Sequence, residues 1–263
     1  MQYDNILLDT RDGVATITLN RPAKLNAYTV EMGDEFMDAL ARVRDDQRAR
    51  VLVITAAGRA FCAGIDIEDA AAARKSGYTE WHEKVIRFVA TAPGVMTEMD
   101  KPIVAAVNGA AVGLGATLAL ACDIRIAADV ARFALPFGRV GLAPEFGSTF
   151  TLPRIVGLGR ALELVLTNKT INASEAKSIG LVNEVVPAGE LAQAVTNVTA
   201  GMAKGSYMAM RLAKQGLYRG SAGSLEGQLA WEREALRACF GSTDHEEGLN
   251  AFLEKREPKF SAK

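Results

Sequence analysis

Cysteine and histidine are scarce in this chain of 263 residues. Its three cysteines, Cys62, Cys122 and Cys239, are far apart and lack the short spacings that bind zinc, and the histidines are His82 and His245. Scattered cysteines in odd number predict buried, reduced thiols in a reducing compartment. A zinc centre or a Ser-His-Asp triad needs more histidine and a closer spacing than this, so we predict no metal site.

An excess of charge of either sign is also lacking. The chain has 30 Lys and Arg against 31 Asp and Glu, with a formal net charge of -1. Binding to nucleic acid depends on a basic excess that neutralises phosphates. We therefore predict no nucleic-acid partner.

Uninterrupted apolar runs of membrane-spanning length are missing. The longest apolar stretch, 103–121, is broken by Asn108 and by glycines. The first residues enter a strand without a charged and then apolar leader, and the ending Ser261-Ala262-Lys263 differs from the Ser-Lys-Leu peroxisomal signal. We expect no membrane partner and a cytoplasmic location.

Apolar patterning predicts an α/β chain with buried, parallel strands. Short β-rich runs occupy 6–10, 14–19, 51–55, 103–107, 123–127 and 132–134. Helical spacing occupies 30–44 and 78–99, and later 149–156, 160–166, 174–179, 191–204, 206–218, 225–239 and 244–255. We divide the chain into a core at 1–195 and a helical region at 196–263, whose apolar faces need the core or another subunit as a partner.

Two glycine-containing loops follow buried strands, at 59–67 and at 108–116, and the second opens a helix. Glycine lets a ligand approach the backbone closely, and a helix N-terminus offers unpaired N–H groups. Two such loops that converge would supply two donors to one developing oxyanion. The two loops could instead be ordinary strand-to-helix turns, or they could bind a phosphate. The glycines at 113–115 do not form a dinucleotide-binding or Walker motif.

Six segments carry a specific pattern in their order and spacing. They are NRPAKLNA at 20–27, FCAGID at 61–66, KPIVAAVNG at 101–109, ACDI at 121–124, ASEAKSIGLV at 173–182 and GLNAFLEKR at 248–256. With these segments the chain resembles the crotonase (enoyl-CoA hydratase/isomerase) superfamily over nearly its whole length. The resemblance implies a spiral of repeated ββα units followed by a C-terminal helical trimerisation region. It also implies a homotrimer or a hexamer built as a dimer of trimers, and no cofactor except the CoA of an acyl-CoA substrate.

The resemblance further implies which residues form the site. The oxyanion would be held by the backbone N–H groups of Ile65 and Leu114, so the bulk of their side chains does not matter. The substrate and its CoA would be contacted by Lys24, Leu25, Ala27, Ala63, Gly64, Asp66, Ile67, Gly113 and Phe137.

The acid and base residues distinguish the reactions of this superfamily. Typical hydratases carry carboxylates where this chain has Thr117 and Phe137, and adding water needs such a pair. Glu145, in the LAPE turn at 142–145, resembles the single glutamate of 3-enoyl-CoA isomerases, which moves a proton from C2 to C4. We predict that reaction, with Glu145 as the acid/base.

Several alternatives stay open at this point. We expect Phe133, Phe137 and Phe146 to desolvate Glu145 and raise its pKa, but Phe137 could be plain core and Glu145 a solvated turn residue. Hydratase-like activity, an aromatic-acyl-CoA dehalogenase, a thioester hydrolase or a non-catalytic homologue fit the same fold. His82 either assists at the acyl pocket or lies on a solvated helix surface.

Overall fold

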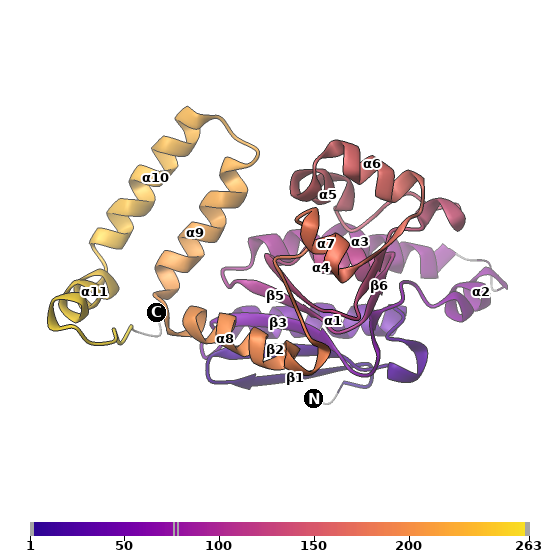
Figure 1. Ribbon diagram of the computed structural model, residues 1–263, viewed down its shortest axis with the longest axis horizontal. Helices are drawn as coiled ribbons and strands as arrows, with labels where there is room; N and C mark the ends of the chain where they lie inside the picture. The colour runs from indigo at the N-terminus through magenta and orange to yellow at the C-terminus, as the bar shows by residue number, and fades with distance from the viewer. Residues whose placement is uncertain (1–2, 76, 78, 261–263) are drawn as a thin grey trace.

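Two β-sheets organise the chain up to Val186 in the computed structural model, which describes residues 3–75, 77 and 79–260 (Figure 1). The strands are β1 (Ile6–Arg11), β2 (Val14–Leu19), β3 (Val51–Ala56), β4 (Ala60–Cys62), β5 (Ile103–Val107), β6 (Ala110–Val112), β7 (Ile124–Ala128), β8 (Arg132–Ala134), β9 (Thr170–Asn172) and β10 (Glu184–Val186). The main helices are α1 (Val30–Asp45), α2 (Ile67–Lys75), α3 (Thr79–Glu98), α4 (Leu114–Leu120), α5 (Ser148–Val156), α6 (Leu158–Leu166), α7 (Ala173–Ser178), α8 (Leu191–Lys204), α9 (Tyr207–Gly220), α10 (Leu225–Phe240) and α11 (Thr243–Glu254). Two short 3-10 turns, η1 (Pro22–Lys24) and η2 (Phe137–Arg139), flank the site described below.

The larger sheet has the strand order β1-β2-β3-β5-β7-β10. β1 and β2 form the predicted antiparallel hairpin, and the remaining neighbours pair in parallel. Alternate residues of β3 face opposite sides. Val51 and Val53 pack with Leu191 and Val195 of α8, whereas Leu52 belongs to the main core with α1 and α3. Burial on both faces explains the continuous apolar runs of these strands.

The smaller sheet has the order β4-β6-β8-β9, with β4, β6 and β8 parallel and β9 antiparallel. Each turn of the chain adds one strand to the larger sheet and the next strand to the smaller one: β3 then β4, β5 then β6, β7 then β8. This stepwise winding, with helices between the turns, is the predicted spiral of ββα units.

Beyond α8 the chain leaves the sheets. Figure 1 shows α9 and α10 side by side as a hairpin beside the core, with α11 at the lower end of α10, on the side away from the sheets. The two helices approach closely because Gly216 of α9 faces Trp231 of α10, where an added Cβ would lie 2.5 Å from the indole ring. α9 is fixed to the core at its inner side by Lys214, which donates to the carbonyls of Met96 and Lys101.

The predicted longer elements are confirmed within a residue or two of their bounds, but four short strands were missed. β4 and β6 lie inside the two glycine loops, and β9 and β10 occur between predicted helices. The predicted boundary at 195–196 falls inside α8, which packs on the larger sheet, so the chain departs from the core only after Lys204. Tyr78 of the predicted helix and the ending 261–263 lie outside the described residues. Within the described part of the chain, none of the helices combines the length and apolarity needed to cross a bilayer.

Candidate active site

The two glycine loops meet because β4 and β6 are parallel neighbours. Backbone atoms approach more closely than a side chain would permit. A Cβ on Gly115 would lie 2.2 Å from the carbonyl oxygen of Cys62, and a Cβ on Gly109 would lie 2.1 Å from that of Arg59. Gly64, with a positive φ of 97°, lies against Val112 in the same way. Glycine at these positions is therefore what brings the loops together.

The backbone N–H groups predicted for the oxyanion lie on these facing loops. A Cβ on Gly64 would be 3.9 Å from the nitrogen of Leu114, the first residue of α4. The N–H groups of Ile65 and Leu114 have no hydrogen-bond acceptor among the described residues. Two unused donors that belong to adjacent loops can bind one oxygen that becomes negatively charged.

Glu145 is held by a turn between η2 and α5. Its carbonyl accepts from the N–H of Ser148 at 3.0 Å. The next residue, Phe146, has a positive φ of 56°, which is rare for a bulky residue, and its ring is buried against Phe88 with centroids 5.5 Å apart. We attribute the unusual backbone to this burial, which fixes the direction of the preceding glutamate.

The carboxyl group of Glu145 has few hydrogen-bond partners. The hydroxyl of Thr117 donates to Oε1 at 2.8 Å, while Oε2 is buried without a hydrogen-bond partner among the described residues. Burial raises the pKa of Glu145 to about 7, against the opposing effect of the Thr117 hydrogen bond. Near neutral pH the group is thus present as both acid and carboxylate, which suits a residue that takes up and returns a proton.

A cavity of about 500 Å³ joins these groups. It is bounded by both glycine loops, by α2 and α3 and by η2. Glu145 is the only carboxylate among the described residues that line it, and most of the others are apolar, such as Val85, Val89 and Phe137. A site of this size and character binds an apolar group and strengthens the electrostatic effect of its few polar atoms.

Comparison with known proteins agrees with this geometry. The family model described as enoyl-CoA hydratase/isomerase matches residues 9–263. The chain belongs to this family. It is 38% identical to the crotonyl-CoA hydratase of Syntrophomonas wolfei over the full length of both chains. It is 37% identical to the 1,2-epoxyphenylacetyl-CoA isomerase of Escherichia coli, with 98% of each chain covered. The crystal structure of an enoyl-CoA hydratase from Bacillus anthracis superposes with a TM-score of 0.92 at 34% identity, covering 99% of this chain and all of that one.

As a member of the enoyl-CoA hydratase/isomerase family, the protein is an acyl-CoA enzyme. Most of the residues predicted to contact substrate line the cavity. They are Ala63, Gly64, Ile65, Ile67, Gly113, Leu114, Phe137 and Glu145. The structure thus brings the predicted oxyanion donors, the predicted acid/base and part of the predicted CoA contacts into one space.

The remaining predicted CoA contacts lie next to the cavity rather than in its wall. Leu25, in a left-handed conformation after η1, accepts at its carbonyl from the N–H of Ala63 at 3.0 Å. Asp66 pairs with Arg21 at 3.0 Å, and Arg21 also donates to the carbonyl of Ala27. The ammonium of Lys24 is exposed and lies 2.6 Å from the carboxylate of Glu68. These contacts fix the segment around η1 against the first glycine loop.

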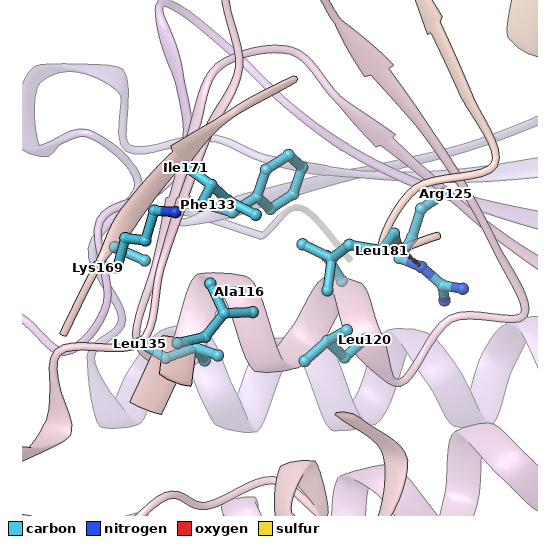
Figure 2. Close-up of a pocket in the computed structure, with 11 residues that line it drawn as sticks. Ala116, Leu120, Arg125, Phe133, Leu135, Lys169, Ile171 and Leu181 are labelled. Atoms are coloured by element: carbon cyan, nitrogen blue, oxygen red, sulfur yellow. Dashed lines mark hydrogen bonds between the residues drawn. The ribbon is translucent and has the colours of Figure 1, made fainter. Parts of the chain in front are cut away.

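The three phenylalanines that were predicted to desolvate Glu145 lie in three different places. Phe137 is buried and lines the cavity, whereas Phe146 packs against Phe88 behind the turn. Phe133 was misassigned: it lines a separate space of about 10 Å³ next to α4, with Ile171 of β9 (Figure 2). The ring is buried there as part of the main core.

Two features of the site go beyond the sequence. Of the two positions left open for His82, the structure has the one at the cavity: the residue is half-buried and lines the cavity, with its ring 5.6 Å from that of Trp81. Thr117 was read only as a missing carboxylate, yet it is the hydrogen-bond partner of Glu145. Its distance along the chain from Glu145 hid this contact, because local spacing carries no signal for a pair that only the fold brings together.

Proposed function

We propose that the protein isomerises 3-enoyl-CoA to trans-2-enoyl-CoA with Glu145 as the single acid/base. The observation that carries the proposal is a cavity with one carboxylate and two backbone donors. Its acidic group, the only one among the described residues of the lining, has a pKa raised to about 7 by burial. A double-bond shift needs one group that removes and returns a proton, whereas hydration needs both activation of water and protonation of carbon.

In this reaction the Glu145 carboxylate removes a proton from C2, the carbon next to the thioester carbonyl. The C–H bond breaks, an O–H bond forms on Glu145, and the electron pair moves to the thioester oxygen. The N–H groups of Ile65 and Leu114 stabilise that oxygen as it becomes negative. The oxygen then reforms the thioester carbonyl, the double bond shifts from C3–C4 to C2–C3, and C4 takes the proton as the O–H bond of Glu145 breaks.

The substrate contributes the CoA group, and no further cofactor takes part in the proposal. Lys24, Leu25, Ala27 and Asp66 lie beside the cavity and are proposed to hold the CoA moiety. Ala63, Gly64 and Ile67 would contact it from the first glycine loop.

The C-terminal helices are proposed to assemble three copies of the chain, or six. Exposed apolar side chains on α9, α10 and α11 support this proposal, because an apolar surface of this extent is otherwise rare in a monomer. They are Leu217, Leu225, Leu229, Leu236, Phe240, Leu249, Phe252 and Leu253.

Hydration of a 2-enoyl-CoA is the second candidate. The relative named crotonyl-CoA hydratase, 38% identical over its full length, favours it. The relative named 1,2-epoxyphenylacetyl-CoA isomerase, at 37%, favours isomerisation instead. The chemistry of the cavity decides our preference, because Thr117 and the apolar Phe137 cannot supply a second carboxylate.

Two parallel assays separate these candidates. Wild-type protein should convert 3-hexenoyl-CoA to the conjugated 2-hexenoyl-CoA and hydrate crotonyl-CoA far more slowly. Glu145→Ala should lower the isomerisation rate by about 10²- to 10⁴-fold, the range for loss of a general acid/base. Glu184→Gln, which changes an exposed glutamate on β10, serves as the matched control and should keep the wild-type rate. Absence of isomerisation by the wild type, or full activity of Glu145→Ala, would contradict the proposal.

A further inference from the structure

Thr117 lies between two hydrogen-bond acceptors. Its Oγ1 is 2.8 Å from Oε1 of Glu145 and 3.1 Å from the carbonyl oxygen of Leu114, one helical turn earlier in α4. The residue is fully buried at 0% exposure, so bulk water cannot take the place of either partner. A threonine hydroxyl carries one proton and two lone pairs. It can donate to only one of these two oxygens at a time.

The protonation state of Glu145 selects between the two. When Glu145 is a carboxylate, a proton directed at Oε1 makes a charge-assisted hydrogen bond. When Glu145 is the neutral acid with its proton on Oε1, that proton can be donated to Oγ1 of Thr117, whose own proton then turns to the Leu114 carbonyl. Back-bonding of a helical threonine to a carbonyl of the preceding turn is a common geometry, so both orientations are accessible.

We propose that Thr117 is a positioning residue whose hydroxyl rotates between Glu145 and the Leu114 carbonyl and gives Glu145 a hydrogen bond in both of its protonation states. The threonine keeps its proton throughout, since only the direction of its O–H bond changes. This inference rests on the proposed function for its role in turnover. Glu145 alternates between carboxylate and acid within each cycle, and a partner that suits both forms keeps the carboxyl group in one place.

The position of Thr117 explains why a hydroxyl serves here. Oε2 of Glu145 is buried without a partner among the described residues, so the Thr117 hydroxyl is what holds the carboxyl group in the free enzyme. A valine would fill the same volume but leave Oε1 and the charge on it without a donor. A second carboxylate would repel the first instead of holding it.

Other titratable or charged groups near Glu145 must be considered for any test that depends on pH. Burial raises the pKa of the Cys62 thiol on β4 to about 12, and that of the Tyr28 hydroxyl far above its usual value, so neither ionises near neutral pH. His82 of α3 lines the same cavity, and its substitution by Gln isolates its contribution. The charged groups on the elements either side of Glu145 are the exposed Arg139 of η2 and Arg154 of α5.

The first test measures the pKa of Glu145 without any turnover, by NMR titration of ¹³C-labelled glutamate carboxyl groups, with Glu145→Gln assigning the signal. Thr117→Val should raise this pKa by about one unit, because a hydrogen bond to a charged group is worth more than one to its neutral form. Thr117→Ser should restore the wild-type value. Thr199→Val is the matched control, because Thr199 is a buried threonine back-bonded within α8 and remote from Glu145. An unchanged pKa in Thr117→Val would overturn the inference.

The second test asks whether the hydrogen bond exists in both states. Free energies of unfolding of wild type, Thr117→Val, Glu145→Ala and the double variant form a mutant cycle, because an alanine at 145 cannot hydrogen-bond to Thr117. The cycle is measured about two pH units below and above the Glu145 pKa. The rotating hydroxyl predicts coupling between Thr117 and Glu145 at both pH values. Coupling at the high pH alone would mean that the hydrogen bond is lost when Glu145 is protonated, and would contradict the proposal.

Failure of the proposed function would look different from failure of this inference. If 3-enoyl-CoA is not converted, the pKa shift and the coupling at both pH values should still be found. If it is converted, the acidic limb of kcat/KM against pH in Thr117→Val should move up by the same unit as the pKa. The rate should then recover at high pH, which a purely structural defect would not produce.

Discussion

Two carboxyl groups inside this protein are treated in opposite ways. Asp123, between α4 and β7, accepts three hydrogen bonds or ion-pair contacts, from the N–H of Ile103 at 2.7 Å, from Lys214 at 2.9 Å and from Tyr218 at 2.8 Å. Glu145 has the Thr117 hydroxyl on one oxygen, and its other oxygen is buried without a partner in the described chain. The first carboxylate ties α9 to the core, and the second is kept short of partners so that it can exchange a proton.

The difference shows how one fold separates stability from chemistry. The buried charge of Lys214 is paired with Asp123 and with two carbonyls. Removing Asp123 leaves this charge without its counter-charge, which should destabilise the fold. Glu145 is reactive because its carboxyl group is desolvated, and burying the charged form lowers the stability of the fold. Replacing Glu145 should therefore stabilise the protein. Substitutions at the two sites are therefore expected to act in opposite directions.

The largest effect on stability is expected from Asp123→Ala. It leaves the Lys214 ammonium, which is 7% exposed, without its counter-charge, and breaking such a buried pair costs about 3–5 kcal/mol. Urea denaturation measures the loss in free energy of unfolding. Asp45→Ala, which removes one side of the exposed Arg44–Asp45 pair, is the control and should change stability by less than about 1 kcal/mol. Equal losses of stability in the two variants would contradict the claim that the buried Asp123 stabilises the fold more than the exposed Asp45.

Gly115→Ala tests whether close backbone approach builds the site. The added Cβ would collide with the Cys62 carbonyl at 2.2 Å, so the glycine loops must move apart. We expect a loss of about 1–3 kcal/mol in stability, the range for overpacking, together with loss of isomerisation because the donors of Ile65 and Leu114 separate. Gly159→Ala in α6, where the added Cβ meets nothing within 4 Å, is the control and should be neutral or slightly stabilising. Normal activity of Gly115→Ala would show that the loops need not touch.

The smallest of these effects is the pH dependence of stability caused by Glu145. Its folded-state pKa of about 7 lies above the ordinary glutamate value of 4.5, so the folded state favours the neutral acid. The stabilising contribution is complete below about pH 4.5 and is lost as the pH rises through 7, which amounts to about 2 kcal/mol after allowance for partial exposure. Relative to Glu145→Gln, the wild type should lose stability between pH 5 and 8. A flat difference across this window would mean that the Glu145 carboxyl is not desolvated.

The long elements could be predicted because burial leaves a local imprint. The apolar run 51–55 is buried on both faces as β3, and helical spacing marks α1 and α8. Three-residue strands such as β4 and β6 leave no such imprint, since they consist mostly of small residues within glycine loops. Their pairing is fixed by neighbours far along the chain.

The site was predictable in its residues but not in their contacts. Ile65, Leu114 and Glu145 were found through motifs, and the structure brings them around one cavity. Neither the Thr117 hydrogen bond nor the position of Phe133 away from the cavity could be read from spacing. Both depend on which way a side chain points once distant segments pack, and that is a property of the assembled fold.

Proton transfer by one carboxylate is the central claim, and an isotope experiment tests it most directly. 3-Hexenoyl-CoA carrying deuterium at C2 should give 2-hexenoyl-CoA with part of that deuterium at C4, because the same Glu145 carboxyl removes and returns it in a cavity with few polar groups. Glu145→Gln should give almost no product. Product whose added C4 hydrogen comes wholly from solvent, or 3-hydroxyacyl-CoA as the main product, would contradict the account.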